Sequence, residues 1–160
     1  MAKIVFLSCT KSKKDKLCPA QELYSESPMF QKTLEYGKKL KPNKMFILSA
    51  KHHIVPLDKK LAPYELTLKD MGKDEKQSWG EYVSKQAPKL GINLSKDKFI
   101  FLTGNEYSKP LTDYIPEQNM SFPLEGKRFG ERLQWLNQQI NEVINKIKLI
   151  IHESLKRRIK

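Results

Sequence analysis

The chain has 160 residues, a length that suits one domain with a full hydrophobic core. Hydrophobic residues make up 39% of the sequence, which argues against a fibrous or fully disordered protein. The 30 Lys and Arg residues against 18 Asp and Glu residues give a formal net charge of +12, so a polyanion such as nucleic acid is the first partner to consider. The alternative is a lysine-rich, solvated surface without such a partner.

Cysteine count and hydropathy favour a reduced, cytoplasmic location. Cys9 and Cys18 are too few for a disulfide framework, and no run approaches the ~20 apolar residues of a membrane-spanning helix. A zinc site would need ligands from these cysteines and from His52 and His53, whose spacing matches no ordinary zinc pattern. We therefore expect no membrane span, no metal and no other cofactor.

The first half of the chain alternates strand and helix patterns. Residues 3–7 form a short apolar run rich in branched side chains, which is typical of a buried strand. A helix is predicted over residues 28–40, because Ser27 is a suitable N-cap and Pro28 suits the first helical position. Residues 44–50 are a second apolar run and predict a second buried strand.

The second half begins with a long irregular segment, residues 51–71. Segments of this length without regular structure are uncommon in a compact domain and are usually functional. Residues 74–90 have the apolar spacing of a helix, and residues 98–103 predict a third buried strand. A long helix is predicted over residues 130–151.

The C-terminal segment, residues 129–160, combines this long helix with a basic tail. Three residues of its apolar stripe are expected to bury against the sheet: Leu133, Leu136 and Ile140. Arg128 and Arg132 are expected to face solvent with the terminal basic cluster. Positive charge thus gathers at both ends of the sequence, and it would form one basic patch if both ends lie on one face.

The order of elements predicts a single three-layer α/β/α domain over residues 1–160, with a mainly parallel central sheet. In such sheets, ligands bind outside the carboxyl ends of the strands. All three predicted strands lead into polar loops there, at residues 8–11, 51–53 and 104–107. We therefore expect the candidate site at this edge of the sheet.

The first loop, SCTKSKK, suits an anion, with Ser8 and Lys11 as candidate phosphate contacts. It lacks the glycines of a Walker or Rossmann loop. Cys9 has two open interpretations: a nucleophile activated beside His52, or a small buried filler. For the later lysines of this loop, the alternative to an anion-binding role is a solvated turn.

The irregular segment supplies the candidate catalytic groups. His52 follows the second strand directly and titrates near neutral pH, which suits an acid or base, although a packed or capping histidine is the alternative. Glu65 is the first choice for a catalytic carboxylate, because Pro63 and Tyr64 fix its approach, and Asp58 is the second choice. Tyr64 itself suits stacking on a base.

Four motifs resemble an uncharacterised bacterial and phage protein family: SCTKSKK, ELYSESPMFQKTLEY, FILSAKHHIVPLDKKLAPYELTL and FPLEGKRFGERLQWL. The resemblance covers residues 4–137. This family usually has Gly after the sequence SAKH, and the present chain has His53 there.

The same order of motifs is more distantly similar to the uracil-DNA-glycosylase-like domain of archaeosine-type tRNA transglycosylase relatives. The matching residues are Ser8, Cys9 and Lys11, then Tyr24, Ser25 and Ser27, then Ser49, Ala50 and Pro56. This resemblance implies a three-layer fold and a link to nucleobase or nucleic-acid chemistry. The usual uracil-glycosylase motifs, a water-activating Asp and a His-Pro-Ser loop, are not present in ordinary form.

Two main hypotheses follow. In the first, an enzyme hydrolyses or transfers an N-glycosidic bond: Glu65 or Asp58 stabilises the sugar, His52 and Asn105 hydrogen-bond the base, and Tyr64 or Tyr107 stacks on it. Ser8, Cys9 and Lys11 complete the expected binding residues. In the second, the chain is a non-catalytic nucleic-acid-binding module on a glycosylase-like fold, which its Lys-rich ends favour. An enzyme for a free nucleotide, with a deep pocket, is a third.

Overall fold

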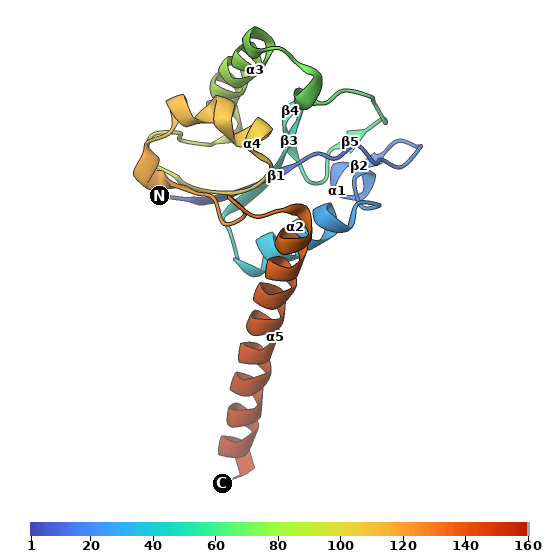
Figure 1. The fold of residues 1–160 in the computed structure, drawn as a ribbon. Helices are drawn as coiled ribbons and strands as arrows, with labels where there is room; N and C mark the ends of the chain where they lie inside the picture. The colour runs from blue at the N-terminus through green and yellow to red at the C-terminus, as the bar shows by residue number, and fades with distance from the viewer. Residues whose placement is uncertain (160) are drawn as a thin grey trace.

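Five strands form the central sheet of the computed structural model, which describes residues 1–159 (Figure 1). The strand order is β4-β3-β1-β6-β7. β1 (Lys3–Ser8) lies at the centre and pairs in parallel with β3 (Lys44–Ser49) and β6 (Lys98–Leu102), while β7 (Met120–Ser121) is parallel to β6. β4 (His53–Pro56) pairs antiparallel with β3 at one edge. The prediction of an α/β fold with a mainly parallel sheet is confirmed.

The hydrophobic core lies on both faces of β1. Residues 4–7 of this strand are fully buried, as expected for a central parallel strand covered on both sides. The ring of Phe6 lies 5.7 Å from that of Phe99 and 5.4 Å from that of Phe101, which join β1 to β6. Because the core is continuous through the sheet, the carboxyl ends of the strands are held in a fixed arrangement.

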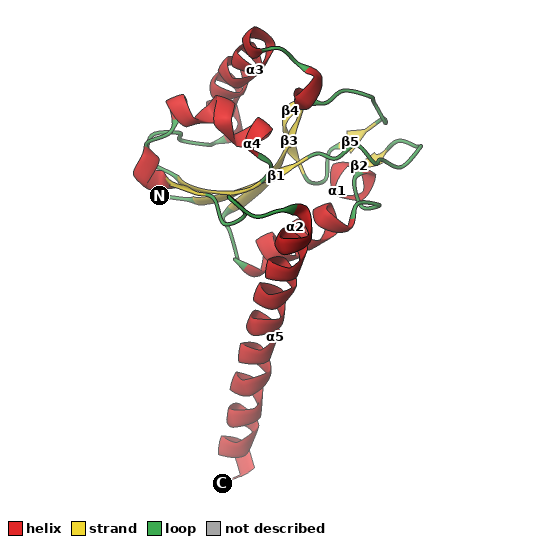
Figure 2. Ribbon diagram, viewed as in Figure 1, coloured by secondary structure: helices red, strands yellow, loops and turns green. Residues whose placement is uncertain are grey.

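Helices cover both faces of the sheet (Figure 2). α2 (Pro28–Lys39) and α5 (Phe129–Ile159) lie on one side, and α3 (Lys73–Gln86) and α4 (Asn105–Ser108) lie on the other. The remaining short elements are α1 (Ala20–Leu23), an antiparallel pair of β2 (Cys18–Pro19) and β5 (Lys60–Leu61), and 3-10 turns at Leu68–Asp70, Ala87–Leu90, Lys109–Tyr114 and Glu117–Asn119.

The N-terminus of α2 has the predicted cap. The hydroxyl of Ser27 accepts a hydrogen bond from the backbone N–H of Phe30 at 3.2 Å, and Pro28 takes the first helical position. Gly37 packs closely on the sheet, since a Cβ there would lie 2.9 Å from Met45 and 3.2 Å from Val5. This close approach seats α2 against β1.

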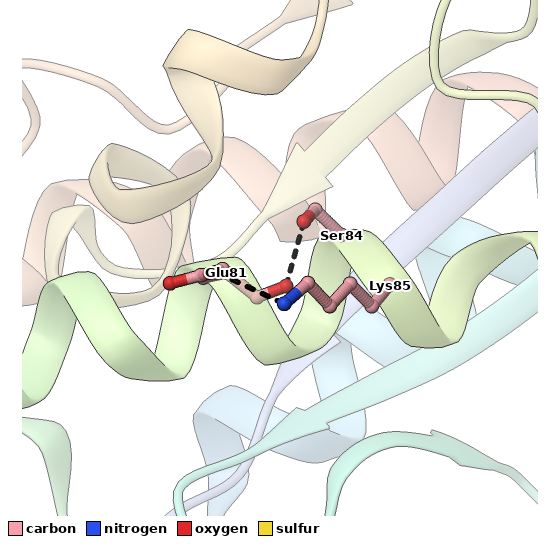
Figure 3. Close-up of polar contacts among 3 residues, drawn as sticks. All are labelled: Glu81, Ser84 and Lys85. Atoms are coloured by element: carbon pink, nitrogen blue, oxygen red, sulfur yellow. Dashed lines mark hydrogen bonds and ion pairs between the residues drawn. The ribbon is translucent and has the colours of Figure 1, made fainter.

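α3 buries Trp79 and Val83 and exposes its opposite face. On that face, Lys85 Nζ donates to Glu81 Oε1 at 3.0 Å, and Ser84 Oγ donates to the Glu81 carbonyl at 2.6 Å (Figure 3). The predicted helix over residues 74–90 is confirmed, although its last four residues form a 3-10 turn. Pro88 has no N–H for the regular helical bond, which explains the change.

α5 departs from the prediction in two ways. It runs to Ile159 rather than residue 151, and from residue 145 onward every described side chain is exposed as the helix projects away from the body (Figure 1). Its apolar stripe packs on α2, and the predicted burial is confirmed for Leu136 and Ile140, while Leu133 is half-buried. Within residues 1–159, no helix has an apolar stretch long enough to cross a membrane.

The segment predicted as irregular contains an edge strand. After β3 the chain reverses through a turn, and His53 has a φ of 62°, in the left-handed region that favours glycine. The reversal lets β4 pair antiparallel with β3. The prediction missed β4 because it is short and ends at Pro56, a residue compatible only with a sheet edge or strand end.

Candidate functional site

A cleft lies where the strand connections diverge. The chain runs from β1 through α2 to β3 on one side of β1, whereas β6 lies on the other side. Such a switch point leaves a crevice between the loops that follow the two strands. An open cleft of about 1180 Å³ occupies this position, between the loop after β1, residues 64–70, the loop after β6 and the start of α5.

Seven of the predicted site residues line this cleft: Ser8, Cys9, Lys11, Tyr64, Glu65, Asn105 and Tyr107. Glu65, Lys11 and Asn105 have exposed side chains, whereas Tyr64 and Tyr107 are buried. The expectation that loops after parallel strands converge at one edge therefore describes most of the candidate site.

Two predicted catalytic residues lie outside the lining. His52 is half-buried, its backbone N–H donates to Ser49 Oγ at 3.0 Å, and its ring stands edge-on to that of Tyr64 at 5.2 Å between centroids. Asp58 is exposed in the turn between β4 and β5. The antiparallel course of β4 accounts for Asp58, because it carries the chain back along the sheet before the turn that holds this residue. His52 lies in the tight turn at the carboxyl end of β3, beside Tyr64 but outside the lining.

A tyrosine pair lies beneath the cleft. The hydroxyl of Tyr64 is 2.7 Å from that of Tyr24 and 2.7 Å from Ser49 Oγ. Trp79 Nε1 donates to the Ser49 carbonyl at 3.0 Å, which fixes the end of β3 against this pair. Burial raises the pKa of Tyr64 and Tyr24 well above the usual range, so both hydroxyls stay neutral at physiological pH and remain able to donate.

Cys9 and Tyr107 meet at the floor of the cleft. Cys9 Sγ lies 3.0 Å from the Tyr107 hydroxyl, and the backbone N–H of Cys9 donates to the Leu48 carbonyl at 3.0 Å. Burial, together with the neighbouring Cys9, raises the pKa of Tyr107. The hydrogen-bond partner of the thiol is thus a neutral tyrosine, and not the His52 base that the nucleophile hypothesis requires.

Lys13 lies beside the tyrosine pair. Its Nζ lies 4.5 Å from the centre of the Tyr64 ring and 5.9 Å from that of Tyr24. Burial lowers the pKa of Lys13, while the neighbouring Cys9 and Glu65 act in the opposite direction. Lys13 and Glu65 both line the cleft, so it offers an amine as well as a carboxylate.

The start of α5 contributes residues that the sequence prediction missed. Arg132 was expected to face solvent, but it is half-buried, lines the cleft and donates from Nε to the Lys127 carbonyl at 2.9 Å. Lys127 also lines the cleft, and Phe129 lines it with 63% of its surface exposed. The alternation of basic and aromatic residues in KRFGER was the available signal.

The cleft is mainly cationic. Its lining holds five basic side chains, Lys11, Lys13, Lys69, Lys127 and Arg132, against three acidic ones, Glu65, Asp70 and Glu106. Among the described residues, no three His, Cys, Asp or Glu side chains are grouped so that they could hold a metal ion. The arrangement suits an anionic organic ligand that also offers a flat apolar surface to Phe129.

The fold and the cleft define an α/β protein with a polar cleft at the carboxyl edge of a mainly parallel sheet. The chain belongs to the family of unknown function DUF6884, whose family model matches residues 4–138. This match covers almost the same span as the motif resemblance. No curated protein matches the chain.

Proposed function

We propose that the protein binds a nucleotide unit of a nucleic acid in the cleft and hydrolyses or transfers its N-glycosidic bond. One observation carries the proposal: a single cleft at the switch point combines basic side chains, the exposed aromatic ring of Phe129 and the carboxylate of Glu65. Phosphates, a base and the sugar between them are the ligand parts that match these three features.

The basic side chains suit the phosphate groups. Lys11, Lys127 and Arg132 approach the cleft from two separate segments, the loop after β1 and the start of α5. Neutralising phosphates releases condensed counterions, so such contacts give an affinity that falls as salt rises. The net charge of +12 adds long-range attraction for the same ligand.

Phe129 and Asn105 are the residues best placed to bind the base. Phe129 offers an exposed ring for stacking, whereas Tyr64 and Tyr107 are 8% and 7% exposed and keep little free ring surface. The exposed amide of Asn105 has both donors and an acceptor for a base edge. The hydroxyls of the two tyrosines are already hydrogen-bonded, that of Tyr64 to Tyr24 and Ser49 and that of Tyr107 to Cys9.

Glu65 is the proposed catalytic carboxylate. In hydrolysis, water forms a bond to the anomeric carbon of the sugar, the bond from that carbon to the base nitrogen breaks, and the base leaves with the bonding electrons. Glu65 takes the proton from water and stabilises positive charge on the sugar, and the departing base takes up a proton. In transfer, an incoming base replaces water. The distant resemblance to a uracil-DNA-glycosylase-like domain supports this chemistry.

A nucleic-acid-binding module without catalysis is the second candidate. The exposure of Glu65 and Asp58 favours it, because a catalytic carboxylate is usually partly buried. The two candidates share the ligand and differ only in whether a base is released.

The test offers modified and unmodified DNA and RNA oligonucleotides to the protein and measures released base by mass spectrometry. We expect Glu65→Gln to lower release at least ~100-fold while oligonucleotide affinity stays within about twofold. The matched control is Glu117→Gln, an exposed carboxylate outside the cleft, which should keep full release. Release that survives Glu65→Gln contradicts the catalytic role. Binding without release on any substrate supports the module.

A further inference from the structure

A small recess opens from the cleft between the ends of β1 and β6. Its volume is about 60 Å³, and it shares Ser8, Thr10 and Arg132 with the lining of the larger cleft. Thr103, the residue directly after β6, lines the recess and not the cleft. The recess therefore lies deeper than the cleft, at the switch point of the sheet.

The hydroxyl of Thr103 marks the recess as a binding site. Thr103 is only 7% exposed, and within residues 1–159 its Oγ1 is a buried side-chain polar atom without a hydrogen-bond partner. Buried hydroxyls in folded proteins nearly always have a partner, so an orphaned one that lines a cavity points to an occupant. The hydroxyls of the other two threonines of the recess already donate hydrogen bonds, Thr10 to the Ser12 carbonyl and Thr33 to the Phe30 carbonyl.

The free donors of the recess suit an oxyanion. Arg132 is anchored through Nε, and its terminal guanidinium nitrogens make no hydrogen bond to any described residue. Ser8 adds a second hydroxyl, and the recess lining contains no Asp or Glu, while the carboxylate of Glu106 in the cleft lies against Gly104 at the border of the two. A guanidinium with hydroxyl donors and no carboxylate favours a phosphate group over a neutral sugar or base.

The walls of the recess indicate which kind of phosphate fits. Away from the cleft they are formed by buried side chains, the apolar Phe30, Leu102 and Leu124 and the polar Thr33 and Thr103, so the recess is a dead end that opens toward the cleft. A phosphodiester inside a strand continues on both sides and needs two ways out. A phosphate monoester has a single attachment and fits a dead end.

We infer that this recess, through Thr103, Ser8 and Arg132, binds the phosphate monoester of a mononucleotide or of a phosphorylated strand end. The inference rests on the proposed function and names the substrate class of the same site. If this inference holds, the nucleotide in the cleft is a free mononucleotide or the last nucleotide of a strand.

The binding test uses labelled oligonucleotides with a 5′-phosphate, a 3′-phosphate or neither, together with nucleosides, nucleoside monophosphates and inorganic phosphate. We expect at least one phosphorylated end, or the monophosphates, to bind about tenfold tighter than the unphosphorylated counterpart. A gain with oligonucleotides identifies a strand end, and a gain with monophosphates alone identifies a free nucleotide.

Substitutions test whether the gain in affinity from the phosphate depends on the recess. Thr103→Val keeps the side-chain shape and should abolish the gain, whereas Thr103→Ser should keep it. Thr103→Val should also leave the melting temperature of the free protein unchanged or higher, because the lost hydroxyl has no partner there. Arg132→Gln should abolish the gain as well. The matched controls, Thr112→Val and Arg128→Gln, change exposed residues outside the recess and should not affect it.

Two results separate this inference from the proposed function. If oligonucleotides bind but phosphate ends add nothing, or if Thr103→Val keeps the gain, the recess is not a phosphate site and the inference is overturned while the proposed function stands. If phosphate and monophosphates bind in a Thr103-dependent way but no oligonucleotide binds and no base is released, the recess is supported and the proposed function fails.

Discussion

The rings of Tyr36 in α2 and Trp135 in α5 meet edge-on, with their centroids 5.3 Å apart. Lys127, which lines the cleft, has its Nζ 5.4 Å from the centre of the Trp135 ring. This contact seats the first turns of α5 on α2 and thereby brings Phe129 and Arg132 to the cleft. The packing of two helices outside the sheet thus decides part of the candidate site.

The seating of α5 depends on Leu136, which is fully buried one residue after Trp135. We expect Leu136→Ala to lower the free energy of unfolding by about 2–5 kcal/mol, from lost transfer energy and the cavity left behind. The matched control is Leu149→Ala on the projecting part of α5, where the side chain is 58% exposed and the effect should stay within about 0.5 kcal/mol. Urea unfolding measures both. Equal costs at the two positions would show that α5 is not seated through this stripe.

His53 stands where the resembling family usually has glycine, and its φ of 62° explains that preference. Its ring packs on Tyr82 at 3.9 Å between centroids, outside the cleft. We expect His53→Gly to be more stable than His53→Ala by about 1 kcal/mol, because both lose the ring but only alanine keeps the Cβ that disfavours this backbone. The order should reverse at His52, whose φ is not positive. An alanine variant at least as stable as the glycine variant would contradict the left-handed geometry.

The pKa shifts of the same two histidines predict how the stability of the fold depends on pH. Burial, with the charges of Lys51 and Lys59, lowers the pKa of His52, and burial with the charge of His52 lowers the pKa of His53. An unfolded histidine titrates near ~6.5, so below that pH the unfolded chain binds protons before the folded one does. Stability should therefore be level above pH ~7 and fall between pH ~6.5 and ~5.

Urea midpoints across this pH range provide the measurement. The double variant His52→Gln, His53→Asn should flatten the decline, and asparagine tolerates the positive φ at position 53. A wild-type midpoint that rises as the pH falls through this window would mean that the folded state holds these protons more tightly, opposite to the effect of burial.

The sheet and most of the cleft could be predicted because their signals are local. The apolar runs at β1, β3 and β6 predict buried parallel strands, and that arrangement alone places Cys9 and Asn105 at one edge. Glu65 also lies in the cleft, although its segment has little regular structure.

The remaining features depend on contacts that a pattern does not specify. The apolar stripe of α5 predicts burial but not the partner, so Arg132 was expected in solvent. The reversal at His53 sends β4 back along the sheet and carries Asp58 away from the carboxyl edge. His52 stays at the end of β3, whereas the cleft lies between the loops after β1 and β6, so it is not part of the lining. That the buried hydroxyl of Thr103 has no hydrogen-bond partner can be seen only in the three-dimensional structure.

The proposed function requires that nucleic acid binds in the cleft through its basic side chains. The most direct test compares two triple variants by fluorescence anisotropy with a labelled single-stranded oligonucleotide at several salt concentrations. One removes cleft charges, Lys11→Gln, Lys127→Gln and Arg132→Gln, and the other removes exposed charges on the projecting part of α5, Lys146→Gln, Lys148→Gln and Lys156→Gln. Both reduce the net charge from +12 by three, to +9, so long-range attraction is matched.

We predict that the cleft variant loses most of its affinity and that its slope of log affinity against log salt becomes shallower by about 2, from three lost phosphate contacts at ~0.7 each. The α5 variant should keep the wild-type slope and an affinity within about threefold of wild type. The opposite pattern, with binding lost in the α5 variant and retained in the cleft variant, would place the nucleic acid on the basic helix and contradict a ligand site in the cleft.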